Sequence, residues 1–267
     1  LKYQFERLLS HKFKTKFGGA TGGLNAHYLT FPNVNWIQFA ENFLCSLGFL
    51  REKYTKQTSH YDSVIEFLDI MKHISIIIGD MARDVWLYMM MGYFRMFTSA
   101  KTIGSSTMPH KVNPIDFENA EGNTKIAIAL LNAIAETAGQ TRLQRDLSSS
   151  TVMRNFGVAL AHILIAIERL KKGLARLFPN LPVIENDLSN HYEVLAEAVQ
   201  LILRKHKIEN AYEIVKELMR TSSSLTKDEF IKKLEELPIP HSIKQQIVNL
   251  TVKDYGLSSI ENLLPPQ

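Results

Sequence analysis

The segment GSSTMPHKVNP, residues 104–114, places two serines, a lysine and an asparagine directly before a proline. We expect Asn113 to cap a helix that has this proline at its first position and Asp116 and Glu118 in its first turn. The start of a helix attracts anions, and Lys111 lies close to that start. These residue types favour a carboxylate site, and the alternative is an ordinary surface loop before a capped helix.

A second group of polar residues lies in TRLQRDLSSSTVMRN, residues 141–155. If a helix begins near Ser148, then Ser150 and Arg154 lie four residues apart on one face, and Arg145 precedes that helix. A hydroxyl and two guanidinium groups that converge in this way suit a phosphate. The alternative is a capped surface helix with two solvated arginines.

Two further patterns are weaker. The stretch KFGGATGG, which begins at Lys16, is either a phosphate cradle or a tight turn, because it does not have the spacing of a phosphate-binding P-loop. The nine histidines show neither an HExxH pattern nor paired Cys/His spacing, so we predict no metal site.

Composition narrows the class of protein. The 267 residues carry a formal net charge of +4, without a dense Lys/Arg block interleaved with aromatic residues. This mild excess fits a site for small anions at least as well as nucleic acid, and we predict no nucleic-acid partner. The single cysteine, Cys45, rules out an internal disulfide and agrees with a reducing compartment.

The elements that must position these residues are long helices. No proline occurs in 33–108 or 115–178, and apolar residues recur every three or four positions between Val64 and Met89. A second helix is expected after Pro114 and a third over about 150–177. The residues expected to face inward are Phe67, Leu68, Met71, Ile74, Ile78, Met81 and Val85 in the first helix and Ile126, Leu130, Leu131 and Ile134 in the second.

We therefore predict an all-α protein, with a long-helix bundle over 1–178 and a smaller C-terminal helical domain over 179–267. The broad apolar faces indicate burial against other subunits. The longest apolar run, Phe156–Ile167, is shorter than the ~18 residues of a membrane span, so we expect a soluble protein. The first residues show no initiator Met or signal-peptide pattern, and we expect a chain truncated at its front.

The string GSSTMPHKVNP resembles the signature of the fumarase/aspartase superfamily, whose members release fumarate by β-elimination. The extension HKVNPIDFEN narrows this resemblance to the adenylosuccinate lyase family, and the similarity runs from KFGGATGGLNAH to HYEVLAEAVQLILRKHKIENAYEIVKEL. It implies cleavage of adenylosuccinate to AMP and fumarate, and of SAICAR to AICAR, in cytoplasmic purine nucleotide biosynthesis. It also implies a fumarase/aspartase-type bundle, no cofactor, and a homotetramer with shared active sites.

The resemblance implies a role for individual residues. Ser105 would be the general base, while Lys111 and Asn113 would hold the succinyl carboxylates. A serine hydroxyl is a poor base, and each unit by which its pKa is lowered requires about 1.4 kcal/mol of differential stabilisation. Lys111 could supply part of this and stabilise the carbanion. The other residues implied to contact substrate are Gln57, Ser106, Met108, Val112, Asn119, Arg145, Ser150, Thr151 and Arg154.

The general acid of the family is a histidine in a THGQPA-like segment, which this sequence does not contain. We therefore expect that acid outside the chain, and we expect an isolated copy of the chain to be inactive. Three alternatives stay open. They are an argininosuccinate lyase or aspartase-like relative without a phosphate site, a structural protein such as the lens crystallins of this superfamily, and a nucleic-acid binder.

Overall fold

The computed structural model describes residues 1–97, 113–220, 225–252 and 255–256. Helices make up most of the described chain, which confirms the predicted all-α class. The helices are α1 (Lys2–Ser10), α2 (Asn25–Thr30), α3 (Trp36–Ser46), α4 (Asp62–Met90), α5 (Ile115–Ala138), α6 (Ser148–Met153), α7 (Phe156–Leu174), α8 (Leu181–Asn190), the 3-10 helix η1 (Tyr192–Leu195), α9 (Ala196–Lys205), α10 (Ala211–Leu218), α11 (Lys227–Glu236) and α12 (His241–Val248). The strands β1 (Lys14–Thr15) and β2 (Leu50–Arg51) pair in parallel, and β3 (Phe94–Met96) pairs with β4 (Leu177–Pro179).

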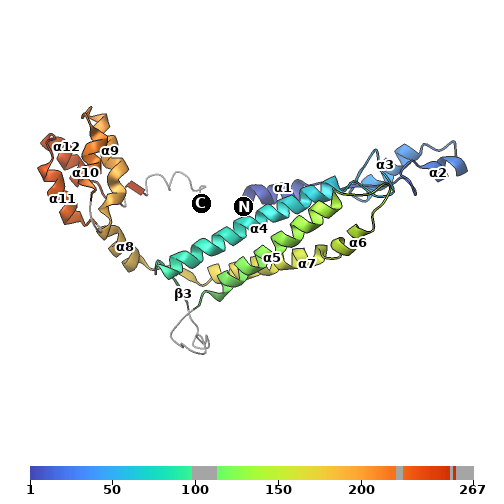
Figure 1. Cartoon of the computed structure of the whole chain (residues 1–267), viewed down its shortest axis with the longest axis horizontal. Coiled ribbons are helices and arrows are strands. Elements are labelled where there is room, and N and C mark those ends of the chain that lie inside the picture. The colour runs from blue at the N-terminus through green and yellow to red at the C-terminus, as the bar shows by residue number, and fades with distance from the viewer. Residues whose placement is uncertain (98–112, 221–224, 253–254, 257–267) are drawn as a thin grey trace. The chain divides into compact units, whose positions relative to one another are not determined.

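The chain forms two compact units, residues 1–178 and 179–267. In the first unit, α4, α5 and α7 lie side by side as long rods (Figure 1). Helix α5 packs against both of the others, and its 24 residues run most of the length of the 29-residue α4. The two ends of α5 are therefore the two ends of the bundle.

Small residues bring α4 and α5 close together. A Cβ atom built on Gly79 of α4 would lie 2.7 Å from Oγ1 of the buried Thr124 on α5. Inward positions beside this contact are occupied by Ala82, Ala120 and Ala127. The expectation that Met81 and Ile126 face inward is therefore wrong, since these side chains are 41% and 50% exposed. The other inward positions are buried or partly buried as predicted: Phe67, Leu68, Met71, Ile74, Ile78, Val85, Leu130, Leu131 and Ile134.

The third predicted helix is interrupted. It begins at Ser148 and breaks between α6 and α7, at Arg154 and Asn155. The side-chain Nδ2 of Asn155 lies 3.4 Å from the carbonyl oxygens of both Thr151 and Val152, and its backbone N–H donates to Val152 at 3.0 Å. Asparagine side chains compete for backbone groups in this way, which favours a break.

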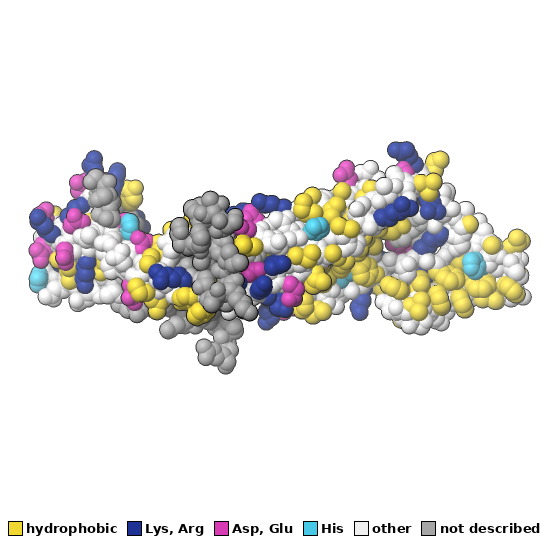
Figure 2. All heavy atoms as spheres, turned by 90° about the horizontal axis from the view of Figure 1, so that it is seen from below, with side chains coloured by type: hydrophobic (Ala, Val, Ile, Leu, Met, Phe, Trp, Pro, Cys, Tyr) yellow, Lys and Arg dark blue, Asp and Glu magenta, His cyan; other side chains and the backbone are white. Residues whose placement is uncertain are grey.

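One stretch in the described part of the chain, Ser148–Leu174, is apolar enough to cross a membrane by length and composition alone. The shorter run considered in the sequence did not reveal it. Its buried residues, among them Ala159, Ile163 and Ala166, belong to two of the apolar core clusters. Core helices of soluble proteins can have the same length and apolar composition. The outer face of α7 keeps Leu164 62% exposed. Figure 2 shows further hydrophobic side chains gathered at the end of the first unit that carries α2 and α3.

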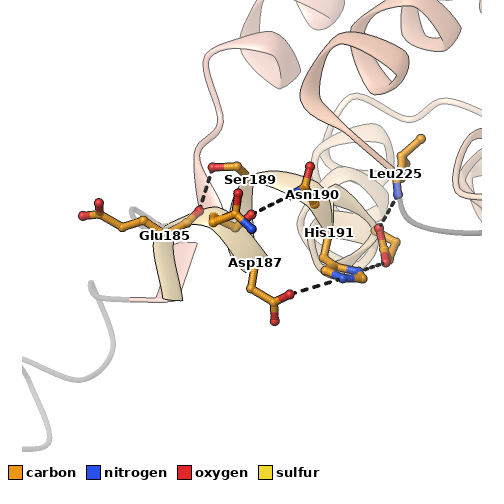
Figure 3. A network of polar contacts seen from close by, with 8 residues as sticks. Glu185, Asp187, Ser189, Asn190, His191 and Leu225 are labelled. Atoms are coloured by element: carbon orange, nitrogen blue, oxygen red, sulfur yellow. Dashed lines mark hydrogen bonds and ion pairs between the residues drawn. The ribbon is translucent and has the colours of Figure 1, made fainter. Parts of the chain in front are cut away.

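The second unit has its own apolar core. Phe230, Leu234, Leu195, Val199, Leu203 and Ile247 are at most 1% exposed and belong to one cluster. A polar network lies at its edge (Figure 3), where the His191 ring contacts Glu193 at 2.6 Å and Asp187 at 3.6 Å. The second carboxylate oxygen of Glu193 accepts the Leu225 N–H at 3.2 Å. This network ties the end of α8 to the segment before α11.

The network makes the stability of this unit depend on pH. The hydrogen bond to Glu193 raises the pKa of His191. Burial raises the pKa of the Glu193 carboxyl, but hydrogen bonds from His191 and from backbone amides outweigh that effect, and the net pKa is lowered. The histidine contribution is complete below its unfolded pKa of about 6.5 and is lost as the pH rises through the folded value. The glutamate contribution is present above an unfolded value of about 4.3 and is lost as the pH falls through the folded value.

We expect the substitution His191→Gln to flatten this dependence. Wild-type protein should lose melting temperature between about pH 6 and pH 9, where a histidine with a raised pKa is deprotonated, and the variant should lose less. Differential scanning calorimetry across that range measures the melting temperatures of the wild type and the variant. His241→Gln, at an exposed histidine of the same unit, is the control and should behave as wild type. Equal losses in wild type and His191→Gln would contradict the prediction.

Candidate active site

Three segments that are distant in sequence meet at the α3 end of the bundle. The Gln57 N–H donates to Oε1 of Gln144 at 3.1 Å, across 87 residues. The Lys16 ammonium donates to the carbonyl oxygens of Gln57 and, at 2.6 Å, of Gly19. The structure therefore brings Gln57, a predicted substrate contact, next to the segment that carries the predicted phosphate-binding residues. Spacing in the sequence alone does not reveal this proximity.

A cavity of about 170 Å³ opens beside this contact. Its walls come from the segment around His60, from the end of α5 and from Asp146 and Ser149. The Ser148 N–H donates to Asp146 at 2.8 Å and Arg142 lies 3.3 Å from it, so these contacts hold the pKa of the Asp146 carboxyl below its ordinary value. The wall therefore carries an ionised carboxylate at this point, which is paired with Arg142.

The residues predicted to hold phosphate are on the surface nearby. Arg145, Ser150, Thr151 and Arg154 are all exposed, and none of them lines the cavity. The Ser150 hydroxyl donates to the carbonyl oxygen of Leu147 at 2.9 Å. The structure thus places these four residues on one short segment but does not gather them around a common pocket within the described chain.

The glycine stretch is a tight turn in this structure. Gly22 has a φ of +86°, and a Cβ atom there would lie 2.2 Å from the carbonyl oxygen of Thr55 and 2.8 Å from that of Lys56. Only glycine permits this approach without strain. The turn therefore packs against the backbone directly before Gln57 and fixes its position.

We expect Gly22→Ala to destabilise the protein and disturb this end of the bundle, because the new methyl group must displace backbone atoms. Gly48→Ala is a matched control, since Gly48 also has a positive φ of +83° but has open space around its Cβ position. The control should cost about 1–2 kcal/mol of backbone strain, and Gly22→Ala should cost at least about 2 kcal/mol more. Urea unfolding monitored by circular dichroism measures both. Equal losses would show that the contact with Thr55 is unimportant.

The other end of the bundle carries the start of α5. Asn113 does not cap this helix as predicted. The helix begins at Ile115 with Pro114 as its N-cap residue, and among the described residues no side chain caps it. The carbonyl oxygen of Pro114 accepts the N–H groups of Phe117 at 3.0 Å and Glu118 at 3.1 Å, so the proline lies one position earlier than expected. Asn113 itself is partly buried.

Asn119 belongs to a polar chain between α5 and α7. Its Oδ1 accepts from Nδ2 of Asn123 at 3.0 Å, and Oδ1 of Asn123 lies 2.7 Å from Nδ1 of His162. The sequence did not predict the contacts of Asn119 with Asn123 or of Asn123 with His162. The signals were present, since two asparagines four residues apart share a helix face and His162 interrupts an apolar run.

The predicted base and its neighbours, Ser105, Ser106, Met108, Lys111 and Val112, lie outside the described residues. They precede α5, whereas Gln57 and the predicted phosphate residues lie at or beyond its far end. At a rise of about 1.5 Å per residue, the 24 residues of α5 span about 36 Å. Within the described residues, no group of three or more His, Cys, Asp or Glu side chains is arranged to hold a metal ion.

Comparison with known proteins decides the family. A family model described as "Lyase" matches residues 2–128, and one described as "Adenylosuccinate lyase C-terminal" matches residues 141–256. The chain is 43% identical over 260 residues to the adenylosuccinate lyase of Legionella pneumophila (strain Corby), and 41% identical over 261 residues to that of Haemophilus influenzae. The chain belongs to the adenylosuccinate lyase family. These alignments cover 97% and 98% of it.

The chain spans about 57% of the length of these relatives from the adenylosuccinate lyase family. The fold is shared more widely. The 3-carboxy-cis,cis-muconate lactonizing enzyme of Pseudomonas putida superimposes with a TM-score of 0.67 at 18% identity, over 92% of this chain and 56% of that one. The fumarate lyase:delta crystallin of Brucella melitensis gives 0.62 at 16% identity, over 93% and 54%. These likenesses confirm the predicted long-helix fold.

Proposed function

We propose that the protein containing this chain is an adenylosuccinate lyase, which eliminates fumarate from adenylosuccinate to give AMP and from SAICAR to give AICAR. The observation that carries the proposal is the intact string GSSTMPHKVNPIDFEN, residues 104–119, in a chain 43% identical to an adenylosuccinate lyase. A protein that kept only the fold would have no need to retain Ser105 and Lys111 together.

The proposed chemistry uses the segment before α5. Ser105 takes the proton from the carbon β to the departing nitrogen, and the electron pair forms the double bond of fumarate as the C–N bond breaks. Lys111 and Asn113 bind the succinyl carboxylates, with Ser106, Met108, Val112 and Asn119 as further contacts. The α5 N-terminus supports this assignment because the helix dipole favours negative charge there. A general acid must protonate the leaving nitrogen, and we assign it to a histidine outside this sequence.

The nucleotide half of the site is assigned to the other end of α5. Arg145, Ser150, Thr151 and Arg154 would hold the phosphate, with Gln57 beside them. Their exposure supports this role, because Arg145 and Arg154 have no ion-pair partner within the described residues and an exposed guanidinium group can bind a ligand. The start of α5, next to Asn113, and its far end, beyond which Arg145 lies, are about 36 Å apart, which is longer than the substrate.

We therefore propose that copies of the chain share their active sites in a homotetramer, so that one copy supplies the start of α5 and another supplies the phosphate residues. The exposed apolar residues support this association, because large apolar patches on soluble proteins mark interfaces. On the long helices they include Ile76, Leu87, Ile126, Val158, Leu164 and Ile165. We also propose that the protein acts in the cytoplasm.

The test is an assay of the protein at its natural length with adenylosuccinate and, separately, argininosuccinate and aspartate, followed by the ultraviolet absorbance of fumarate. Turnover of adenylosuccinate alone supports the proposal. Turnover of argininosuccinate or aspartate would replace it with a relative of the same superfamily. Absence of turnover in a folded, tetrameric preparation would indicate a structural protein.

A further inference from the structure

Arg176, two residues after the end of α7, contacts one residue on each side of the segment 98–112. The Arg176 guanidinium donates to the carbonyl oxygen of Phe97 through Nε at 3.2 Å and through Nη2 at 3.0 Å. Its Nη1 lies 3.5 Å from Oδ2 of Asp116. The backbone adds a third link, since the Phe97 N–H donates to the Arg176 carbonyl oxygen at 2.9 Å. We call this set of contacts the Arg176 bridge.

Asp116 is a suitable anchor for the bridge. Its side chain is only 7% exposed, and it lies in the first turn of α5, where the helix dipole favours a carboxylate. Each of its oxygens has one arginine, because Arg169 Nη1 lies 3.3 Å from Oδ1 and Arg176 binds on the other side. A buried carboxylate with two cationic partners keeps a fixed position, since losing either partner reduces the compensation of a desolvated charge.

The helices that carry these groups are themselves tightly packed. Phe117, beside Asp116, is fully buried, and a Cβ atom on Gly173 of α7 would lie only 2.8 Å from its ring. Arg169 lies on α7 and Arg176 lies two residues after its end, and both contact Asp116 in the first turn of α5. The bridge therefore joins two rigid elements.

We propose that Arg176 is a positioning residue for the lyase reaction, because it fixes the distance between Phe97 and Asp116, which lie on either side of the segment that carries Ser105 and Lys111. This inference rests on the proposed function. Arg176 itself does not touch substrate in this assignment. A displacement of about 1 Å at reacting groups costs up to about 100-fold in rate, so a residue that acts only through geometry can have a large effect.

The experiment compares Arg176→Met, Arg176→Lys and Asp116→Asn in the protein at its natural length. Arg176→Met should lower kcat about 10- to 100-fold with a smaller change in KM, because the variant loses alignment and keeps its binding groups. Arg176→Lys should recover part of kcat, since lysine keeps the charge but lacks the planar fork that reaches both acceptors. Arg176→Met and Asp116→Asn combined should cost less than the product of their separate effects, because they break one bridge.

Arg83→Met is the matched control, because Arg83 also joins α4 to α5, through a 3.6 Å ion pair with Glu121, away from the bridge. It should leave kcat unchanged. Hydrogen–deuterium exchange of peptides covering 98–112 gives a readout independent of activity, and exchange should be faster in Arg176→Met than in wild type or Arg83→Met. Unchanged exchange and unchanged kcat in folded Arg176→Met would overturn the inference. If wild-type protein lacks lyase activity, the proposed function fails, and the exchange result alone still decides whether the bridge holds this segment.

Discussion

Replacement of Ser105 by alanine should lower kcat for adenylosuccinate by about 10²- to 10⁴-fold, the range that a positioned general base contributes. KM should change little, since the hydroxyl is assigned to proton removal and the succinyl carboxylates remain bound by Lys111 and Asn113. Steady-state assays of fumarate release at natural chain length measure both constants. Binding of AMP, followed by calorimetry, should be unaffected.

Two other serines define the controls for this prediction. Ser106→Ala should cost about tenfold or less, because its hydroxyl offers at most one hydrogen bond to the ligand. Ser10→Ala should have no effect, since that hydroxyl is exposed and donates to the Arg7 carbonyl oxygen within α1. A native rate in Ser105→Ala would remove Ser105 from the chemistry. If Ser106→Ala proved the more damaging of the two, the base would have to be reassigned to the second serine.

Helical periodicity predicted the long helices because their buried faces are mostly large apolar residues. It failed where the helices approach most closely. Met81 and Ile126 were expected inside because they are large and apolar, but the inward positions beside them belong to Ala82 and Ala127. A pattern that counts large apolar residues overlooks small ones, although the small ones set the distance between α4 and α5. Which side chains are buried depends on how the two helices pack together. The sequence of one helix does not contain that information.

The candidate site shows a similar division. The proline and the acidic residues after it predicted the start of α5 to within one position. Asn113 was predicted as the N-cap residue, but Pro114 occupies that position. The contact between Gln57 and Gln144 could not be predicted from spacing, because it depends on how two loops are brought together by the bundle. The roles of Ser105 and Lys111 came from resemblance alone and stay predictions.

The pairing of Asp116 with two arginines also required the structure. In the sequence, Asp116 indicated only a favourable acid near a helix start, and nothing pointed to Arg169 or Arg176 as its partners. Those arginines lie 53 and 60 residues further along the chain. A buried ion pair between distant residues becomes visible only when the helices that carry them are placed.

Loss of the proposed phosphate contacts should have the second large effect, a rise in KM. The structure indicates how much of that rise each residue should cause. In the combined variant Ser150→Ala with Arg154→Gln, KM for adenylosuccinate should rise by about 100-fold or more, since each charged hydrogen bond contributes about 1.5–3 kcal/mol. Arg154 should account for most of it. The Ser150 hydroxyl already donates to the Leu147 carbonyl oxygen and must give up that bond to donate to a phosphate, whereas Arg154 is exposed and has no such bond within the described residues.

Succinyladenosine, which lacks the phosphate, separates this effect from general damage to the site. Wild type should prefer adenylosuccinate strongly, and the combined variant should lose most of that preference while its kcat/KM for succinyladenosine stays the same. Both substitutions are at exposed positions, so the free energy of unfolding should change by no more than about 0.5 kcal/mol. Arg83→Gln, at an exposed arginine far along α4, should retain the wild-type preference. An unchanged preference in the combined variant would assign the phosphate to other residues, and equal losses for both substrates would mean that Ser150 and Arg154 support the structure of the site rather than bind the nucleotide.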